Sequence, residues 1–78
     1  PRLFKQAQLY LAELYFRQNQ YEQSAAIYRK LISLVSDPVK KEEISAKYVV
    51  TLIRSGKIAE SKKAIKKHIA QFKSATAN

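Results

Sequence analysis

The chain has 78 residues, of which 46% are apolar, with one glycine and two prolines. This length limits it to a single small domain, and the apolar content with so few helix breakers predicts an all-α fold rather than disorder. Fifteen basic side chains against six acidic ones give a net charge of +9. The absence of cysteine excludes disulfides and thiolate metal sites.

Targeting and membrane segments are not visible. No run approaches the roughly 18 apolar residues of a membrane span, and no signal peptide is recognisable. The sequence does not determine the cellular compartment, although an intracellular one is favoured. The chain starts at Pro1 and contains no methionine, so we expect it to be a piece of a longer or processed protein. Ten of the fifteen basic residues lie from Lys40 onward, so an electrostatic partner should meet the second half first.

The first half predicts a helical hairpin. One helix is expected from Arg2 to about Gln18, where Asn19 can adopt the left-handed conformation that ends a helix. Its apolar face is expected to hold Ala7, Leu11, Leu14 and Tyr15. A second helix is expected from Tyr21 or Glu22 to Val35. Its inner stripe comprises Tyr21, Ser24, Ala25, Tyr28, Leu31, Ile32 and Val35. A link of two or three residues forces the two helices antiparallel.

The second half predicts another hairpin. Asp37 can cap a new helix that has Pro38 at its first position and ends near Ser55. Its apolar positions are Ile44, Tyr48, Val49, Leu52 and Ile53. Gly56 then suits a left-handed residue, where valine would be strained. The last helix is expected from Ile58 to Phe72 or Lys73, and residues 74–78 to fray. Its stripe comprises Ile58, Ser61, Ile65, Ile69 and Phe72.

The two halves are related by an internal repeat with an offset of 37 residues. At this offset Tyr15 matches Leu52, Asn19 matches Gly56 and Ser24 matches Ser61. The other matched pairs are Leu11 with Tyr48, Ala12 with Val49, Phe16 with Ile53, Arg17 with Arg54, Tyr21 with Ile58, Tyr28 with Ile65, and Ile32 with Ile69. Such self-similarity predicts a repeat architecture of two like units, 1–36 and 37–73.

This pattern resembles the tetratricopeptide (TPR) repeat over about residues 5–72. It reads Leu11-Ala12-x-x-Tyr15, Asn19-x-Tyr21-x-x-Ser24-x-x-x-Tyr28, and recurs from Tyr48 to Ile65. The resemblance implies two stacked antiparallel hairpins from a longer solenoid. The sequence departs from the family at Gln8, Leu31, Pro38, Ser45 and His68, and its period exceeds the usual 34. Tyr10, Ala12, Phe16, Tyr21 and Tyr28 also resemble the N-terminal TPR pair found in the seventh-subunit family of the anaphase-promoting complex.

In the TPR family the first helix of each hairpin lines a partner-binding groove. Carried over by position, this implies a groove formed by Gln6, Leu9, Glu13, Phe16, Arg17, Glu43, Ala46, Val50, Ile53 and Arg54. Several of these are apolar yet point away from the second helix of their own hairpin, so they need a cover. That cover is either a ligand or a helix missing from this chain.

The groove positions also restrict the ligand. The family's carboxylate-clamp members need lysine and asparagine where this chain has Leu9, Glu13, Ala46 and Val50. The resemblance therefore implies no binding of the acidic C-terminal tails of chaperones. Arg17 and its repeat equivalent can grip an anion, or simply stabilise a helix C-terminus. Arg17 is also expected to pair with Glu13, four residues earlier.

A basic patch is expected on the last helix. Its members are Lys62, Lys63, Lys66 and Lys67, which lie off the apolar stripe. They form either a solvated face or a surface for nucleic acid or anionic lipid. His68, the single histidine, has no ligand partner at metal-binding spacing. No nucleophile with a base and no phosphate loop is present, so neither enzyme activity nor a cofactor is expected.

These observations predict a protein–protein interaction scaffold rather than an enzyme. The partner is expected to be a peptide, a helix or another subunit, as part of a multi-subunit assembly such as a ubiquitin-ligase complex. Self-association as a homodimer is a related option, since an uncapped solenoid leaves a face open. The alternative is a helical repeat that binds nucleic acid through its basic second half.

Overall fold

A computed structural model describes the backbone of residues 2–76 and the side chains of residues 3–67. It contains four helices, α1 (Arg2–Arg17), α2 (Tyr21–Leu34), α3 (Pro38–Arg54) and α4 (Ile58–Thr76), and no strand within the described backbone. The all-α prediction is confirmed, and the first three helices end within one residue of their predicted bounds. Helix α4 continues through residues 74–76, which we expected to fray. The side chains of His68, Ile69 and Phe72 and all of residues 77–78 lie outside the described residues.

Short local signals separate the helices. Asn19 has φ 63° and Gly56 has φ 83°, so each ends the first helix of its hairpin in the left-handed conformation predicted for it. At the start of α3 an Asp37 side-chain oxygen accepts a hydrogen bond of 3.1 Å from the Val39 backbone N–H, and Pro38 occupies the first turn. Residues at three turns therefore determine where the helices of the two hairpins begin and end.

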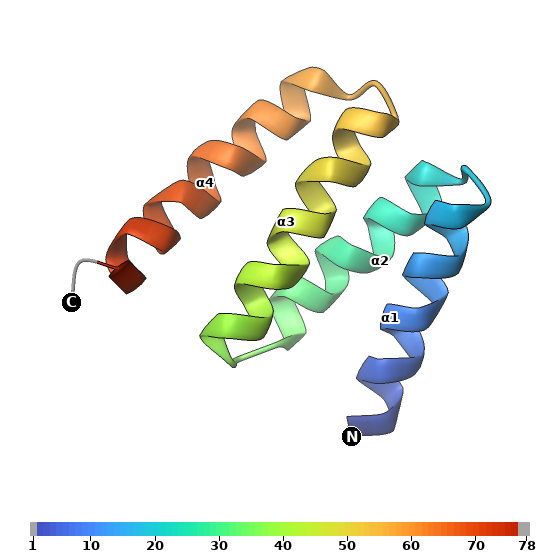
Figure 1. Ribbon diagram of the computed structural model, residues 1–78, viewed down its shortest axis with the longest axis horizontal. Coiled ribbons are helices and arrows are strands. Elements are labelled where there is room, and N and C mark those ends of the chain that lie inside the picture. Colours follow the sequence, from blue (N-terminus) through green and yellow to red (C-terminus); the bar gives the residue numbers. More distant parts are fainter. Residues whose placement is uncertain (1, 77–78) are drawn as a thin grey trace.

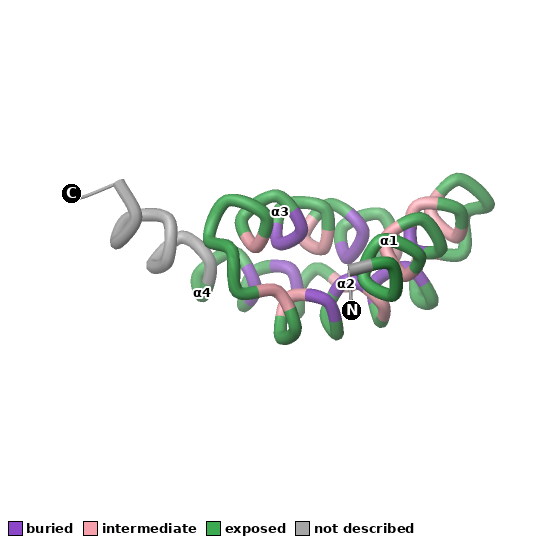
Figure 2. The backbone as a smooth tube through the Cα atoms, turned by 90° about the horizontal axis from the view of Figure 1, so that it is seen from below, coloured by how far each residue is buried: buried purple, intermediate pink, exposed green. Residues whose placement is uncertain are grey.

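The four helices form two layers. Figure 1 shows them following one another across the molecule, and Figure 2 shows α1 and α3 in one layer above α2 and α4. The main contacts join α1 to α2, α2 to α3 and α3 to α4. The shortest dimension of the molecule is 15 Å, which fits two helices packed about 8–10 Å apart. This open arrangement of consecutive hairpins places the first helix of each hairpin on one face.

The core consists of two clusters that share Tyr48. Ala12, Tyr28, Leu31 and Ile44 join α1, α2 and α3. Ala25, Leu52 and Ala64 join α2, α3 and α4, and Tyr48 packs against both clusters. The joint between the hairpins is therefore as well packed as the hairpins themselves.

The buried face of each end helix differs from the predicted one. Among the described side chains of α1 the buried one is Ala12, whereas Leu11 and Leu14 are exposed. On α4 Ser61 is buried as predicted, but Ala64 is buried as well, whereas the predicted Ile58 and Ile65 are exposed. The two end helices contact a neighbour on one side only, and close approach to that neighbour favours small side chains. The apolar residues on their other faces therefore stay exposed.

Equivalent serines in the two hairpins make different hydrogen bonds. The Ser24 hydroxyl donates to the carbonyl oxygen of Ala12 across the α1–α2 contact, at 2.7 Å. The Ser61 hydroxyl instead donates to the carbonyl of Ile58 in its own helix. Val49 stands where the first hairpin has Ala12, and we attribute the difference to this larger side chain. The repeat in sequence is therefore only approximate in packing.

Candidate functional site: a groove between α1 and α3

A groove of about 340 Å³ lies between the first helices of the two hairpins. Its lining residues are Glu13, Phe16 and Arg17 of α1, Tyr28 of α2, and Ala46, Lys47, Val50 and Thr51 of α3. Tyr28 and Thr51 are buried, whereas Val50 is 45% exposed. The groove thus has a floor fixed by the core and apolar walls that reach solvent.

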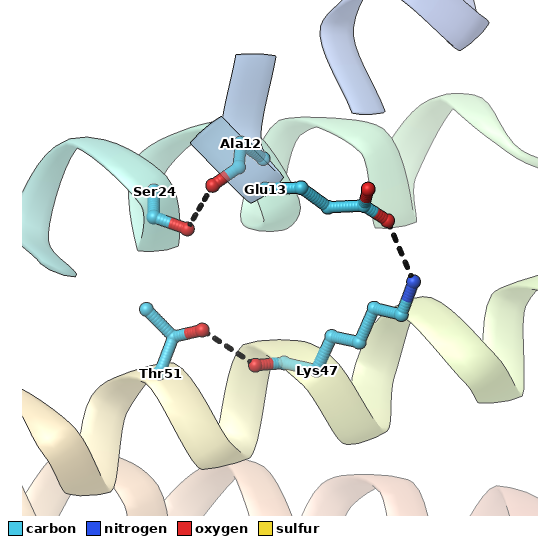
Figure 3. A network of polar contacts seen from close by, with 5 residues as sticks. All are labelled: Ala12, Glu13, Ser24, Lys47 and Thr51. Atoms are coloured by element: carbon cyan, nitrogen blue, oxygen red, sulfur yellow. Dashed lines mark hydrogen bonds and ion pairs between the residues drawn. The ribbon is translucent and has the colours of Figure 1, made fainter. Parts of the chain in front are cut away.

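One ion pair links the two walls of the groove. The Lys47 ammonium donates to a carboxylate oxygen of Glu13 at 3.0 Å, which links α3 to α1 (Figure 3). The hydroxyl of Thr51 donates to the Lys47 carbonyl at 2.7 Å within α3. Because the ion pair crosses between hairpins, it supports the register of α1 against α3. Its contribution is small, about 0.2–1 kcal/mol, because both side chains are partly exposed.

The Glu13–Lys47 pair replaces the pairing expected within α1. Arg17 forms no ion pair with Glu13 within 4 Å among the described side chains. The Glu13 hydrogen bond is the main cause that raises the pKa of Lys47, against a smaller opposing effect of burial. Glu13 is therefore paired with Lys47, and Arg17 lines the groove without an ion pair among the described side chains.

Aromatic contacts order one end of the groove. The ring of Phe16 meets that of Tyr21 edge to face, with centroids 5.2 Å apart. The guanidinium carbon of Arg54 lies 5.7 Å from the Phe16 ring centroid, within the range of a cation–π interaction. Tyr21 is itself held by a 2.8 Å hydrogen bond from its hydroxyl to the Asn19 side chain. Phe16 is therefore positioned by both hairpins while one side of it still lines the groove.

Burial raises the pKa of the Tyr28 phenol on the groove floor. The neighbouring Lys47 charge lowers it in part, and Glu13 raises it. The phenol is therefore neutral under ordinary conditions and presents an apolar ring with a hydroxyl that does not ionise. Such a floor suits an uncharged part of a ligand.

The structure brings together half of the predicted groove residues in this groove. Glu13, Phe16, Arg17, Ala46 and Val50 share this groove, and Arg54 adjoins it through Phe16. Gln6 and Leu9 line a different cavity, of about 380 Å³, beside the start of α3. Ile53 and Glu43 are exposed on α3. The groove is thus shorter than the family pattern implies and lies toward the ends of α1 and α3.

Three groove residues were missed by sequence reasoning. The sequence predicts Tyr28 only as a core residue and predicts neither Thr51 in the groove nor the contact of Lys47 with Glu13. The available signal was the opposite charges of Glu13 and Lys47, which lie on the first helices of the two predicted hairpins.

The predicted basic patch is divided by the structure. Lys62, Lys63, Lys66 and Lys67 are all exposed on α4. Only Lys63 and Lys67 line a second cleft, which also includes Arg29 of α2 and Lys41 of α3. The two pairs therefore have different surroundings.

Comparison with protein-family models, with curated proteins and with solved structures finds no match. Within the described residues, no three His, Cys, Asp or Glu side chains are grouped closely enough to hold a metal ion. None of the described helices is long and apolar enough to cross a membrane.

Proposed function

We propose that this chain is a protein-interaction module that binds a polypeptide segment in the α1–α3 groove. The observation that carries the proposal is the arrangement of Phe16 and Val50, two partly open apolar side chains that face one groove above a buried floor. Apolar groups in such a position lose contact with water when a partner covers them. Their fixed geometry reduces the entropy lost on binding.

The charges around the groove define the partner further. Arg17 lines it and Arg54 stacks on Phe16, and neither makes an ion pair within 4 Å among the described side chains. A carboxylate on the ligand can therefore reach an arginine without displacing an internal partner. The preferred ligand is a peptide or helix with a large apolar side chain next to an acidic group.

The wider assignment belongs to the same proposal. Two consecutive hairpins with their first helices on one face support a TPR-like scaffold. More specifically, we propose that this scaffold belongs to a multi-subunit complex such as a ubiquitin ligase. Self-association is a related form, because α1 also exposes Leu3, Tyr10 and Leu14. Sedimentation across a range of concentrations reports whether the chain dimerises.

Peptide selection followed by mutation tests the groove. A displayed library of random peptides is selected against the chain, and a selected peptide is titrated into ¹⁵N-labelled protein. We expect the largest shifts in the second half of α1 and the middle of α3. Phe16→Glu should weaken binding by about 30-fold or more, since an interface anchor contributes about 2 kcal/mol.

Tyr10→Glu provides a matched control. It adds the same charge to the same helix, at a side chain that is 73% exposed and outside the groove lining. Both variants should keep the helicity of the parent chain by circular dichroism. Equal affinities of the two variants, with helicity intact, would refute the groove proposal.

A further inference from the structure

A second cleft, of about 480 Å³, is lined by residues of α2, α3 and α4. Most of them belong to α2 and α4, which form the layer opposite α1 and α3 (Figure 2). Four basic side chains from three helices converge on it: Arg29 of α2, Lys41 of α3, and Lys63 and Lys67 of α4. Glu60 is the one acidic residue among its lining residues, so the cleft carries a local excess of three positive charges. This concentration arises from the fold, because the four residues span positions 29–67.

None of these four cations forms an ion pair with another described side chain. Among the described side chains the ion pairs within 4 Å are Glu13–Lys47 and Glu22–Lys57, and neither includes a cation of this cleft. Like charges gathered in this way repel one another in the free chain. An anionic occupant removes that repulsion and adds direct attraction, so the site is electrostatically complementary to negative charge.

The floor of the cleft is apolar. Ile32 and Tyr48 are half-buried against the core, and Ala64 is buried. A phosphate group alone has no apolar surface to pack against this floor. A ligand that carries both apolar and acidic groups uses the floor and the rim together.

At one end of the seam between α2 and α4, an ion pair joins α2 to the turn before α4. The Lys57 ammonium lies 3.6 Å from a carboxylate oxygen of Glu22, and a smaller cavity beside this pair shares Arg29, Tyr48 and Glu60 with the cleft. The wider part of the seam, of about 480 Å³ against about 100 Å³ beside the ion pair, is the part that includes Lys63 and Lys67. A trough between two helices has the shape that takes an amphipathic helix.

We propose that this cleft binds an acidic amphipathic helix of a partner protein, with its apolar side chains on Ile32 and Tyr48 and its carboxylates on the four cations. Single-stranded nucleic acid fits less well, because stacking of bases needs open aromatic rings. Tyr48 is the one aromatic residue of the lining, and its ring is packed against both core clusters. The proposal adds a second binding site and does not depend on the groove.

Two double variants of α4 make a matched pair for the test. Lys63→Gln/Lys67→Gln removes two charges from the cleft, and Lys62→Gln/Lys66→Gln removes two from the same helix outside its lining. Both pairs have i, i+4 spacing, both lower the net charge from +9 to +7, and all four lysines are exposed. Neither variant should unfold the chain, which circular dichroism checks.

The probe is a fluorescent helical peptide of about four turns, with leucine on one face and glutamate on the other. Anisotropy is measured at about 0.15 M salt, where the Debye length of about 8 Å suppresses long-range attraction. We expect Lys63→Gln/Lys67→Gln to weaken binding by tenfold or more and Lys62→Gln/Lys66→Gln by no more than about threefold. Replacing the leucines by alanine, or the glutamates by glutamine, should each weaken binding by a similar factor.

The other outcomes overturn the proposal in distinct ways. Equal losses in the two lysine variants indicate attraction to net charge alone. Binding that survives the leucine replacement shows that the apolar floor is unused, and tighter, cleft-dependent binding of an oligothymidylate assigns the site to nucleic acid. A loss in Phe16→Glu but not in Lys63→Gln/Lys67→Gln places the peptide in the α1–α3 groove, which would leave the proposed function standing.

Discussion

Leu52 and Ile53 are neighbours on α3 that should respond very differently to truncation. Leu52 is 2% exposed and belongs to the core cluster that joins α2, α3 and α4, whereas Ile53 is 48% exposed. A buried leucine replaced by alanine costs about 2–5 kcal/mol, because burial is lost and a cavity is left. We expect about 3 kcal/mol for Leu52→Ala.

The expected cost of Ile53→Ala is much smaller. Full burial of an isoleucine contributes about 1.5–3 kcal/mol, so half burial contributes about 1 kcal/mol. Alanine recovers part of this, roughly 0.4 kcal/mol, through its higher helix propensity. The net loss should be about 0.5 kcal/mol, small against a stability of about 5 kcal/mol for a chain of this size.

Urea denaturation followed by circular dichroism measures the difference. With a slope of about 1 kcal/mol per molar, the midpoints of the two variants should differ by 2–3 M. Both variants should fold, so both midpoints are measurable. If Ile53→Ala cost as much as Leu52→Ala, the face of α3 assigned to the core would be wrong, and with it the face assigned to the groove.

Two further predictions concern polar side chains in and near the core. The Ser45 hydroxyl is buried without a hydrogen-bond partner, whereas that of Ser24 is bonded; Ser45→Ala should therefore stabilise the chain by about 1 kcal/mol and Ser24→Ala destabilise it by about 0.5 kcal/mol. Equal signs in urea denaturation would contradict this reasoning. Burial raises the pKa of Tyr28 above 10.0 and the Glu13 hydrogen bond raises the pKa of Lys47 above 10.5. Both groups hold their protons longer in the folded chain, so stability should fall as pH rises above about 10. Tyr28→Phe should flatten this fall in urea midpoints, and an unchanged fall would show that Tyr28 does not contribute.

Helix ends were predictable because their causes are local. A left-handed residue at Asn19 or Gly56, and an aspartate followed by Pro38, act within one turn of the backbone. The buried stripe of α2 was predictable for a different reason. That helix packs between α1 and α3, so its apolar period and its burial agree at Ser24, Ala25, Tyr28 and Leu31.

The faces of the end helices were not predictable from period alone. Helix α1 has apolar side chains on two sides, with Leu14 on one and Phe16 on the other, and the sequence does not say which side meets α2. The choice depends on Ala12, whose small side chain allows the close contact in which Ser24 bonds across the hairpin. The candidate groove was predicted in part for the same reason, since its position follows from which face of α1 is buried.

The sequence by itself determined four helices, their turns and their pairing into two hairpins, because capping, turn geometry and apolar period act over a few neighbouring residues. Tertiary structure alone decided which side chains meet across hairpins. It brought Lys47 to Glu13, set Arg54 on Phe16, and separated Lys63 and Lys67 from Lys62 and Lys66 by joining them to Arg29 and Lys41. These contacts depend on how one helix is rotated and placed against another, and packing over the whole chain sets that rotation.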